Sequence, residues 1–347
     1  MEMLLETDMG KAVSTNPFPT RNDEIIDYSI RPAKNIERKM ICEALARLSI
    51  LSSIRTYHYI GFGSSYFVDL IMFHKALGIQ KLTSIEGNPD MEERVRFNTP
   101  YSCVDVKIGM STDLLPEVEW DENKSILWLD YISPLTGYMF SDLTTFFTRA
   151  LSGSVFIISV NAEVKDEAGL QTITERIKAK LKKDKEVESR VKKSFFAESS
   201  LKKSDYYSVI RNIVNEEITS VLAKRNRLEP DKNYSFKQIF NFIYHDGQAM
   251  LTIGGILFAK KDSAKVRNMA FDNLPFYSND TTSFEISVPH LTNREMQALD
   301  KYLPGFHSDP KSKQEALNKL KNVVSETAIE KYAKVYQYFP SYKEVAI

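Results

Sequence analysis

From residue 56 onward, short apolar runs alternate with longer segments of mixed polarity. The runs are rich in β-branched and aromatic residues, which is typical of buried strands. The segments between them have the length of helices, except the one between 108 and 126, which contains Pro116 and is more loop-like. This alternation predicts βαβ units and a mainly parallel sheet. The five predicted strands cover 56–62, 81–86, 104–108, 126–131 and 155–160.

Apolar residues at helical spacing come before the first of these strands. They follow Arg31-Pro32 and predict a helix near 33–51. After the strands, two apolar runs within 240–259 flank Asp246-Gly247, which is a strong signal for a β-hairpin. The alternative is a helix that ends at Tyr244 and is capped by Ser235 with Gln238.

The segment 163–232 is charged and predicts two or three helices, with a break near Glu229-Pro230. Nine basic residues and four acidic ones lie between 171 and 193, a pattern most often found on a solvated helix face. In the tail we expect a strand at 284–288 and a helix opened by a Thr292/Glu295 capping box and ended by Pro304-Gly305. A last amphipathic helix is expected through roughly 312–337.

These elements predict an α/β fold, a Rossmann-like three-layer sandwich with a mainly parallel sheet, a C-terminal antiparallel hairpin and a helical insertion. The expected organisation is an N-terminal arm and helix (1–52), a Rossmann-like cofactor-binding core (53–162), a charged helical insertion (163–235), the closing hairpin of the core (236–260) and a C-terminal strand with helices (261–347).

Composition narrows the function classes. The 347 residues carry 46 Lys and Arg against 46 Asp and Glu, so the net charge does not indicate a nucleic-acid partner. Cys42 and Cys103 form neither a metal-ligand spacing nor a disulfide framework, which suits a reducing compartment. The N-terminal stretch does not resemble a signal peptide, and no apolar run approaches the ~20 residues of a membrane span. We expect a soluble cytoplasmic protein.

Small and acidic residues follow four predicted strands. Gly61-x-Gly63 follows the first, Glu86 ends the second, Ser111 follows the third and Asp130 ends the fourth. In open α/β sheets, ligands bind beyond the carboxyl ends of the strands, and an acid at the second strand is placed to accept ribose hydroxyls. The alternatives are a tight turn for the glycines, a helix-cap neighbour for Glu86, and a helix cap or an Arg149 ion pair for Asp130.

The order of these residues resembles a known family. The pieces are Gly-x-Gly, then Glu86-x-Asn-Pro-Asp, then Gly109-x-Ser-x-Asp-x-Leu-Pro, then Leu-Asp130-Tyr131. They are similar to class I S-adenosylmethionine-dependent methyltransferases, above all to small-molecule O-methyltransferases of the catechol type. The resemblance covers roughly 56–162 and 238–260. It implies S-adenosylmethionine as the cofactor.

The resemblance also implies roles for individual residues. Gly61 and Gly63 would let the backbone approach the methionine part of the cofactor, Glu86 would hold the ribose, and Ser111 and Thr112 would lie beside the adenine. Asp130 would lie near the methyl donor, where the catechol-type enzymes bind a divalent metal, and Asp130 and Tyr131 are the catalytic candidates. The expected cofactor-binding residues are Gly61, Phe62, Gly63, Ser64, Ser65, Glu86, Gly87, Ser111, Thr112 and Asp130.

The sequence departs from that family at three places. Tyr59 stands where an acid precedes the glycines, no lysine follows Asp130, and the fifth strand ends in Asn161 and Glu163 rather than in the second metal-binding acid. The divalent-metal site is therefore incomplete, and no metal ligand is assigned. We expect an O-methyltransferase for a small molecule. The alternative is a catalytically inactive methyltransferase-like module that acts through a partner protein. His58, His74 and His245 are expected to be structural or surface residues.

Overall fold

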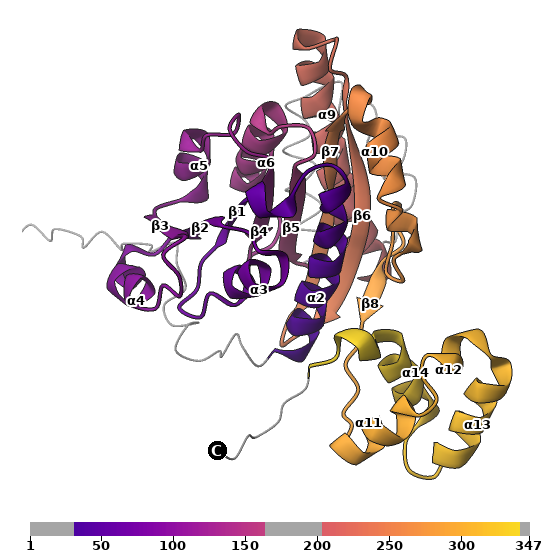
Figure 1. Ribbon diagram of the computed structural model, residues 1–347. Coiled ribbons are helices and arrows are strands. Elements are labelled where there is room, and N and C mark those ends of the chain that lie inside the picture. The colour runs from indigo at the N-terminus through magenta and orange to yellow at the C-terminus, as the bar shows by residue number, and fades with distance from the viewer. Residues whose placement is uncertain (1–30, 164–202, 341–347) are drawn as a thin grey trace, which may run out of the picture.

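The computed structural model describes residues 31–163 and 203–340, and its centre is one eight-stranded sheet (Figure 1). The strand order is β3-β2-β1-β4-β5-β7-β6-β8. The first five strands are parallel, whereas β7 is antiparallel to both β5 and β6. The strands are β1 (His58–Phe62), β2 (Lys81–Glu86), β3 (Val104–Ile108), β4 (Ser125–Asp130), β5 (Val155–Asn161), β6 (Tyr234–His245), β7 (Ala249–Ala259) and β8 (Phe284–Ile286).

Helices cover both faces of the sheet and complete the three layers (Figure 1). On one face Ile126 and Trp128 of β4 pack with the apolar residues of α2 (Pro32–Ala46) and α3 (Val68–Leu77). On the other face Leu127 and Leu129 pack with α6 (Gly137–Arg149) and α9 (Lys203–Leu228). Because side chains alternate along a strand, each buried strand supplies both cores. The predicted Rossmann-like fold is confirmed.

The five predicted parallel strands agree with the observed ones to within two residues, and Asp246-Gly247 does join two antiparallel strands, the first of which begins six residues before the expected run. The alternative helix ending at Tyr244 is wrong, since Ser235 and Gln238 lie in β6. The segment expected to be loop-like contains two short helical turns, α5 (Ser111–Leu114) and η5 (Leu115–Glu117).

The first helix is shorter than predicted, because α2 ends at Ala46 and continues as the 3-10 turn η2 (Arg47–Ile50). Further along, α9 ends at Leu228, as the expected break near Glu229-Pro230 required. The basic run at 171–193 and the N-terminal arm lie outside the described residues. Short helices α4 (Glu92–Phe97) and α10 (Ser263–Asn268) complete this part of the molecule.

The C-terminal helices form a lobe with its own small core (Figure 1). The Thr292/Glu295 capping box is present at the start of α11 (Asn293–Asp300), and α12 (Gly305–Ser308) follows. The single helix expected over 312–337 is wrong. It is divided into α13 (Pro310–Leu320) and α14 (Glu326–Val335), because Ser325 accepts the Ala328 N–H and opens a new helix.

No helix in the described ranges is both long enough and apolar enough to cross a membrane.

Candidate active site

The carboxyl ends of β1 to β4 bring the predicted cofactor residues to one edge of the sheet. Two backbone hydrogen bonds fix the loops there: Gly63 donates to the Ile85 carbonyl at 2.8 Å, and Gly109 donates to the Glu86 carbonyl at 2.9 Å. The loop after β1 is thereby held beside the end of β2, and the loop after β3 is held against Glu86. Gly87 directly follows β2, and Thr112 lies in α5, four residues beyond the end of β3.

Contacts within the protein explain why glycine is needed at 61 and 63. A Cβ on Gly61 would lie 2.5 Å from the hydroxyl oxygen of Tyr59, whose buried side chain folds over it. A Cβ on Gly63 would lie 2.1 Å from Ser84 Oγ. Both distances are shorter than real Cβ contacts, so a side chain at either position would have to displace Tyr59 or Ser84 even without a ligand.

Other side chains of the edge have polar groups that a nucleoside ligand could use. Glu86 is half-buried, and its Oε1 accepts the Asn88 N–H at 2.8 Å, so the carboxylate is held at the end of β2. Ser65 is buried, and its hydroxyl has no hydrogen-bond partner in the described part of the chain. Such a buried orphan group favours a ligand at the loop after β1. The Ser64 hydroxyl, by contrast, accepts the Tyr66 N–H at 3.3 Å.

Asp142 of α6 is a buried acid that the sequence analysis missed. Its Oδ2 accepts hydrogen bonds from Ser111 Oγ and from the Tyr131 hydroxyl, both at 2.5 Å. Burial raises the pKa of Asp142, and burial together with Asp142 raises the pKa of Tyr131. The Tyr131 ring also packs edge-on against Phe62, with 4.9 Å between the ring centroids. The Tyr131 hydroxyl therefore keeps its proton and acts as a hydrogen-bond donor to Asp142.

Asp130 and Tyr131 point to opposite faces of the sheet. Tyr131 belongs to the core beneath α6, whereas Asp130 faces α2, where its Oδ1 lies 2.8 Å from Lys34 Nζ. The predicted alternative partner Arg149 donates instead to the Pro116 carbonyl. The two catalytic candidates are thus not brought together.

Arg31 at the N-cap of α2, and Lys34 and Arg38 within it, each pair with a carboxylate at this edge. Lys34 pairs with Asp130, Arg38 with Asp69 at the start of α3, and Arg31 with Asp246 of the β6–β7 turn at 3.6 Å. Asp246 also accepts the Lys34 backbone N–H at 2.9 Å. Because Lys34 and Arg38 are one turn apart on α2 and Arg31 directly precedes the helix, α2 is held along the edge by charge as well as by apolar packing.

The Lys34 ammonium has a complete set of partners. Besides Asp130, it contacts Glu37 Oε2 at 2.8 Å and the Tyr244 hydroxyl at 3.1 Å, and it lies over the Trp128 ring. Burial opposes its charge, but the two carboxylates outweigh burial, and the pKa of Lys34 is raised. Burial likewise opposes the charge on Asp130, yet Lys34 and Arg38 hold its pKa below the usual range. Burial raises the pKa of Glu37.

Sequence reasoning missed Lys34, Glu37 and Tyr244 at this position. A signal existed in α2, because Lys34, Glu37 and Arg38 continue the helical stripe of the buried Ile41 and Leu45. Charged residues on the apolar side of a helix are expected to meet partners when they are buried.

The residues available for a divalent metal do not fit such an ion. One Asp130 oxygen is paired with Lys34. Asn161 donates from Nδ2 to Gln248 Oε1 and accepts the Glu163 N–H, while Glu163 Oε2 accepts the Ala249 N–H at 2.7 Å. The polar side chains at the end of β5 are thus hydrogen-bonded to the β6–β7 turn rather than available to a metal ion. Within the described ranges, no three His, Cys, Asp or Glu side chains gather as a metal site would require.

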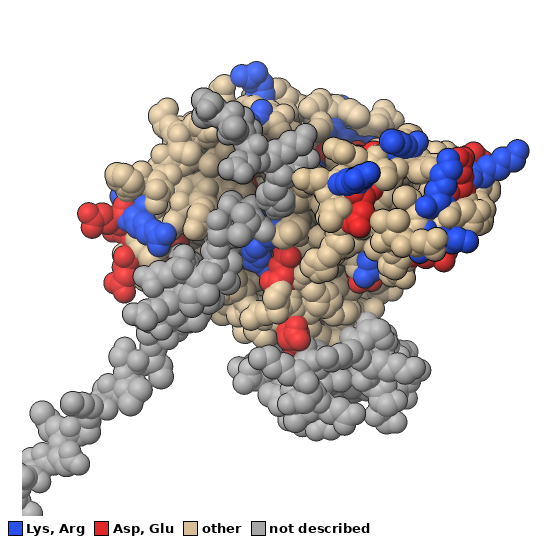
Figure 2. Space-filling view, turned by 90° about the horizontal axis from the view of Figure 1, so that it is seen from below, with Lys and Arg blue, Asp and Glu red and all other residues tan. Residues whose placement is uncertain are grey.

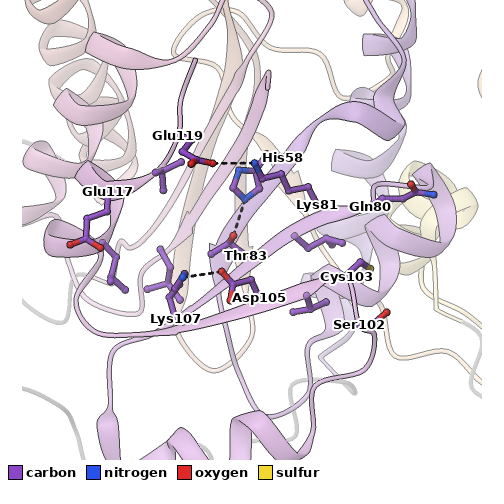
Figure 3. A pocket seen from close by; sticks show the side chains of 15 residues that line it. His58, Gln80, Lys81, Thr83, Ser102, Cys103, Asp105, Lys107, Glu117 and Glu119 are labelled. Atoms are coloured by element: carbon purple, nitrogen blue, oxygen red, sulfur yellow. Dashed lines mark hydrogen bonds and ion pairs between the residues drawn. The ribbon is translucent and has the colours of Figure 1, made fainter. Parts of the chain in front are cut away.

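A cavity of about 540 Å³ lies away from this edge (Figure 3). Its lining comes from His58 of β1, from β2 and β3 with the residues just before each, and from Leu114 and residues 117–119, and it includes none of the predicted site residues. His58 in its wall is bonded to Thr83 Oγ1 at 2.8 Å, and burial lowers its pKa to about 4, so it is neutral as expected of a structural residue. His74 contacts the Ile79 carbonyl, and His245 is exposed.

Charge on the surface does not gather by sign on the face seen in Figure 2. Among the coloured residues there, Lys and Arg are interspersed with Asp and Glu. That face gives no support for a nucleic-acid partner.

Comparison with solved structures finds low overall similarity. A complex of the Haloferax volcanii Trm112 methyltransferase activator with a "putative methyltransferase" shares 17% identity, covering 37% of this chain and 56% of that chain, with a TM-score of 0.27. A predicted O-methyltransferase from Agrobacterium tumefaciens shares 11% identity, with 62% and 81% coverage and a TM-score of 0.32. Spermidine synthase from Thermotoga maritima shares 10%, with 71% and 68% coverage and a TM-score of 0.36. The chain thus spans little more than half of the first of these proteins.

Comparison of the sequence with protein-family models identifies the family to which the chain belongs. No curated protein matches the sequence, but residues 26–347 match the model of a family described as "Putative O-methyltransferase". That match spans nearly the whole chain, and it agrees with the observed sheet order and with the resemblance in the strand-end residues. The chain belongs to this "Putative O-methyltransferase" family.

Proposed function

We propose that this protein transfers the methyl group of S-adenosylmethionine to a hydroxyl oxygen of a small molecule. The observation that carries the proposal is the meeting of Glu86, Ser65, Ser111 and Asp130 at one edge of the sheet. The cofactor supplies an electrophilic methyl group on a sulfonium. In the transfer, the acceptor oxygen would form the new bond to carbon as the sulfur–carbon bond breaks, S-adenosylhomocysteine would be the leaving group, and the hydroxyl proton would pass to water.

In this proposal the loop 61–65 and Gly87 lie along the cofactor, Glu86 holds its ribose, and Ser111 and Thr112 lie beside its base. Asp130 rather than Tyr131 faces the acceptor, because the Asp130 side chain is 26% exposed while the Tyr131 hydroxyl is bonded to Asp142. Its lowered pKa makes Asp130 a weak base. Most of the rate must then come from holding the acceptor in line with the methyl group.

Calorimetry with S-adenosylmethionine and S-adenosylhomocysteine tests cofactor binding before any acceptor is known. We expect one site per chain for both ligands. A chain that binds neither ligand would contradict the proposal. Assays of tritium transfer from labelled S-adenosylmethionine to a panel of phenols, alcohols and amines then identify the acceptor atom.

Glu86→Ala is expected to weaken S-adenosylhomocysteine binding at least tenfold. A carboxylate that accepts ribose hydroxyls contributes roughly 1.5–3 kcal/mol per bond, and 1.4 kcal/mol is about tenfold. The matched control is Glu93→Ala, which removes an exposed acid from α4 and should leave binding unchanged. An effect of Glu86→Ala below twofold would remove Glu86 from the site.

The alternative function is a methyltransferase-like module that acts through a partner protein. The observation that favours it is that Tyr59 and Ser84 alone account for the glycines at 61 and 63. Calorimetry separates the methyltransferase from a module that has lost the cofactor, and the tritium-transfer assay separates it from a module that still binds the cofactor but is inactive.

A further inference from the structure

The position of Lys34 Nζ has the surroundings of a bound cation. Oxygens from three elements converge on it: Asp130 Oδ1 at the end of β4 and Glu37 Oε2 of α2, both at 2.8 Å, and the Tyr244 hydroxyl of β6 at 3.1 Å. Trp128 adds a ring face 4.6 Å away. The Lys34 side chain is 2% exposed, so the charge on it is neutralised by these groups rather than by water.

This position is also where the catechol-type resemblance leads one to expect a metal. Asp130 is the residue that the resemblance assigns to the ion, but its partner here is an ammonium from a helix outside the resembling segment. The other candidates, Asn161 and Glu163, are bonded to the β6–β7 turn. The side chains of this protein therefore do not fit the divalent metal of the catechol-type enzymes. The place beside Asp130 is already occupied by a cation, the Lys34 ammonium.

We propose that the ammonium of Lys34 takes the place of the divalent metal at Asp130, so that this protein works without a divalent ion. Lys34 is a positioning residue in this scheme. It fixes Asp130 through Oδ1, while the Asp130 side chain stays 26% exposed. The role of Lys34 in methyl transfer rests on the proposed function. The location of its ammonium beside Asp130 does not depend on that function.

The replacement has a consequence for the acceptor. A metal ion can bind acceptor oxygens directly, but the Lys34 ammonium donates hydrogen bonds to Asp130 and Tyr244 and lies 2.8 Å from Glu37 Oε2, and its side chain is only 2% exposed. Lys34 is therefore not open to the acceptor. The acceptor class that fits is a molecule with a single reacting hydroxyl, without the paired oxygens that chelate a metal.

The test removes the Lys34 side chain by mutation and supplies the ammonium group again as a small amine in solution. Lys34→Ala removes three methylenes and the ammonium, a space that n-propylammonium can fill. Breaking a buried ion pair leaves unpaired carboxylates, and we expect a melting temperature lower by about 5–10 °C. Added n-propylammonium should raise it again in Lys34→Ala. It should not do so in Lys34→Met, where an apolar chain fills the space, and 1-propanol should act on neither variant. Equal shifts by the amine in the wild type and both variants would overturn the proposal.

A second measurement needs no variant at Lys34. Full-length protein saturated with S-adenosylhomocysteine is titrated with Mn²⁺, and free Mn²⁺ is followed by electron paramagnetic resonance. We expect no stoichiometric binding, and an unchanged S-adenosylhomocysteine affinity in EDTA. Stoichiometric Mn²⁺ binding that Asp130→Asn abolishes would overturn the replacement. Failure to bind S-adenosylhomocysteine would instead count against the proposed function, because the amine test on Lys34→Ala is independent of it.

Discussion

At the scale of single residues, Gly63 shows how a motif residue can have two explanations. The sequence favours a role in letting a ligand approach the backbone, but the structure places Ser84 Oγ where a Gly63 side chain would begin. A bulky substitution at 63 would collide with β2, so loss of cofactor binding in such a variant would not identify a ligand contact. The two causes can be separated only if the collision is removed.

Gly63→Ala is expected to destabilise the wild type by about 1–3 kcal/mol through overpacking. In a Ser84→Ala background the nearest atom becomes the Cβ of residue 84 at 3.5 Å, an ordinary contact, and most of this cost should disappear. Urea denaturation of the four proteins in a double-mutant cycle measures the coupling. Cofactor affinity is then read in the stable double variant, where a loss reports the ligand rather than Ser84. Additive stability effects would show that Ser84 is not the obstacle.

At the scale of elements, α2 joins parts of the sheet that are far apart in sequence. Its bases reach the end of β4, the start of α3 and the β6–β7 turn. That turn in return caps α2, because Asp246 accepts the Lys34 N–H and Arg31 itself makes no side-chain cap. One of the backbone N–H groups that lack a partner at the start of a helix is thus hydrogen-bonded to a residue 212 positions away.

Asp246→Ala should lower the free energy of unfolding by about 0.5–2 kcal/mol, the usual cost of losing an N-terminal cap. Asp246→Asn keeps an oxygen for the Lys34 N–H and loses mainly the ion pair with Arg31, so we expect a smaller cost, of about 1 kcal/mol or less. Hydrogen exchange at the first amides of α2 should quicken in the Ala variant more than in the Asn variant. Equal exchange in both would contradict a capping role.

At the scale of the whole molecule, the C-terminal lobe is tied to the main body. Tyr338 is buried in the main core and donates to Glu43 Oε2 of α2 at 2.5 Å, and Lys39 Nζ contacts the Phe339 carbonyl at 3.3 Å. The same helix that lines the candidate site therefore also holds the end of the described chain.

Tyr338→Ala should destabilise the main body, not only the lobe, by about 3–5 kcal/mol. Both tryptophans, Trp120 and Trp128, are buried in the main cores, so tryptophan fluorescence reports unfolding of that part alone. The control is Val323→Ala at an exposed position of the lobe, for which we expect no change. An unchanged fluorescence midpoint in Tyr338→Ala would mean that the lobe unfolds independently.

Much of the fold could be predicted because strand periodicity, the Asp246-Gly247 turn and the Thr292/Glu295 box are local signals. The break at Ser325 was missed because a polar turn interrupts an amphipathic pattern without glycine or proline. Glu86, Ser111 and Asp130 were found together because strand ends in a parallel sheet must meet at one edge. Lys34 and Asp142 were not found, because each acts from a helix and the sequence does not tell which strand end that helix reaches.

The ion pairs of Arg31, Lys34 and Arg38 also determine at what stage of synthesis and folding this edge of the sheet can be completed. Lys34 has partners 96 and 210 residues further along the chain, and the Tyr338–Glu43 contact spans 295 residues. Contacts of such long range slow folding, and a growing chain can complete them only after their last member has been synthesised. Until the β6–β7 turn emerges from the ribosome, Lys34 and Glu37 have no Tyr244 and no capping Asp246. The nascent first half of the protein can already pair Lys34 with Asp130 and Glu37, but the start of α2 stays uncapped and the edge incomplete until the second half has been made.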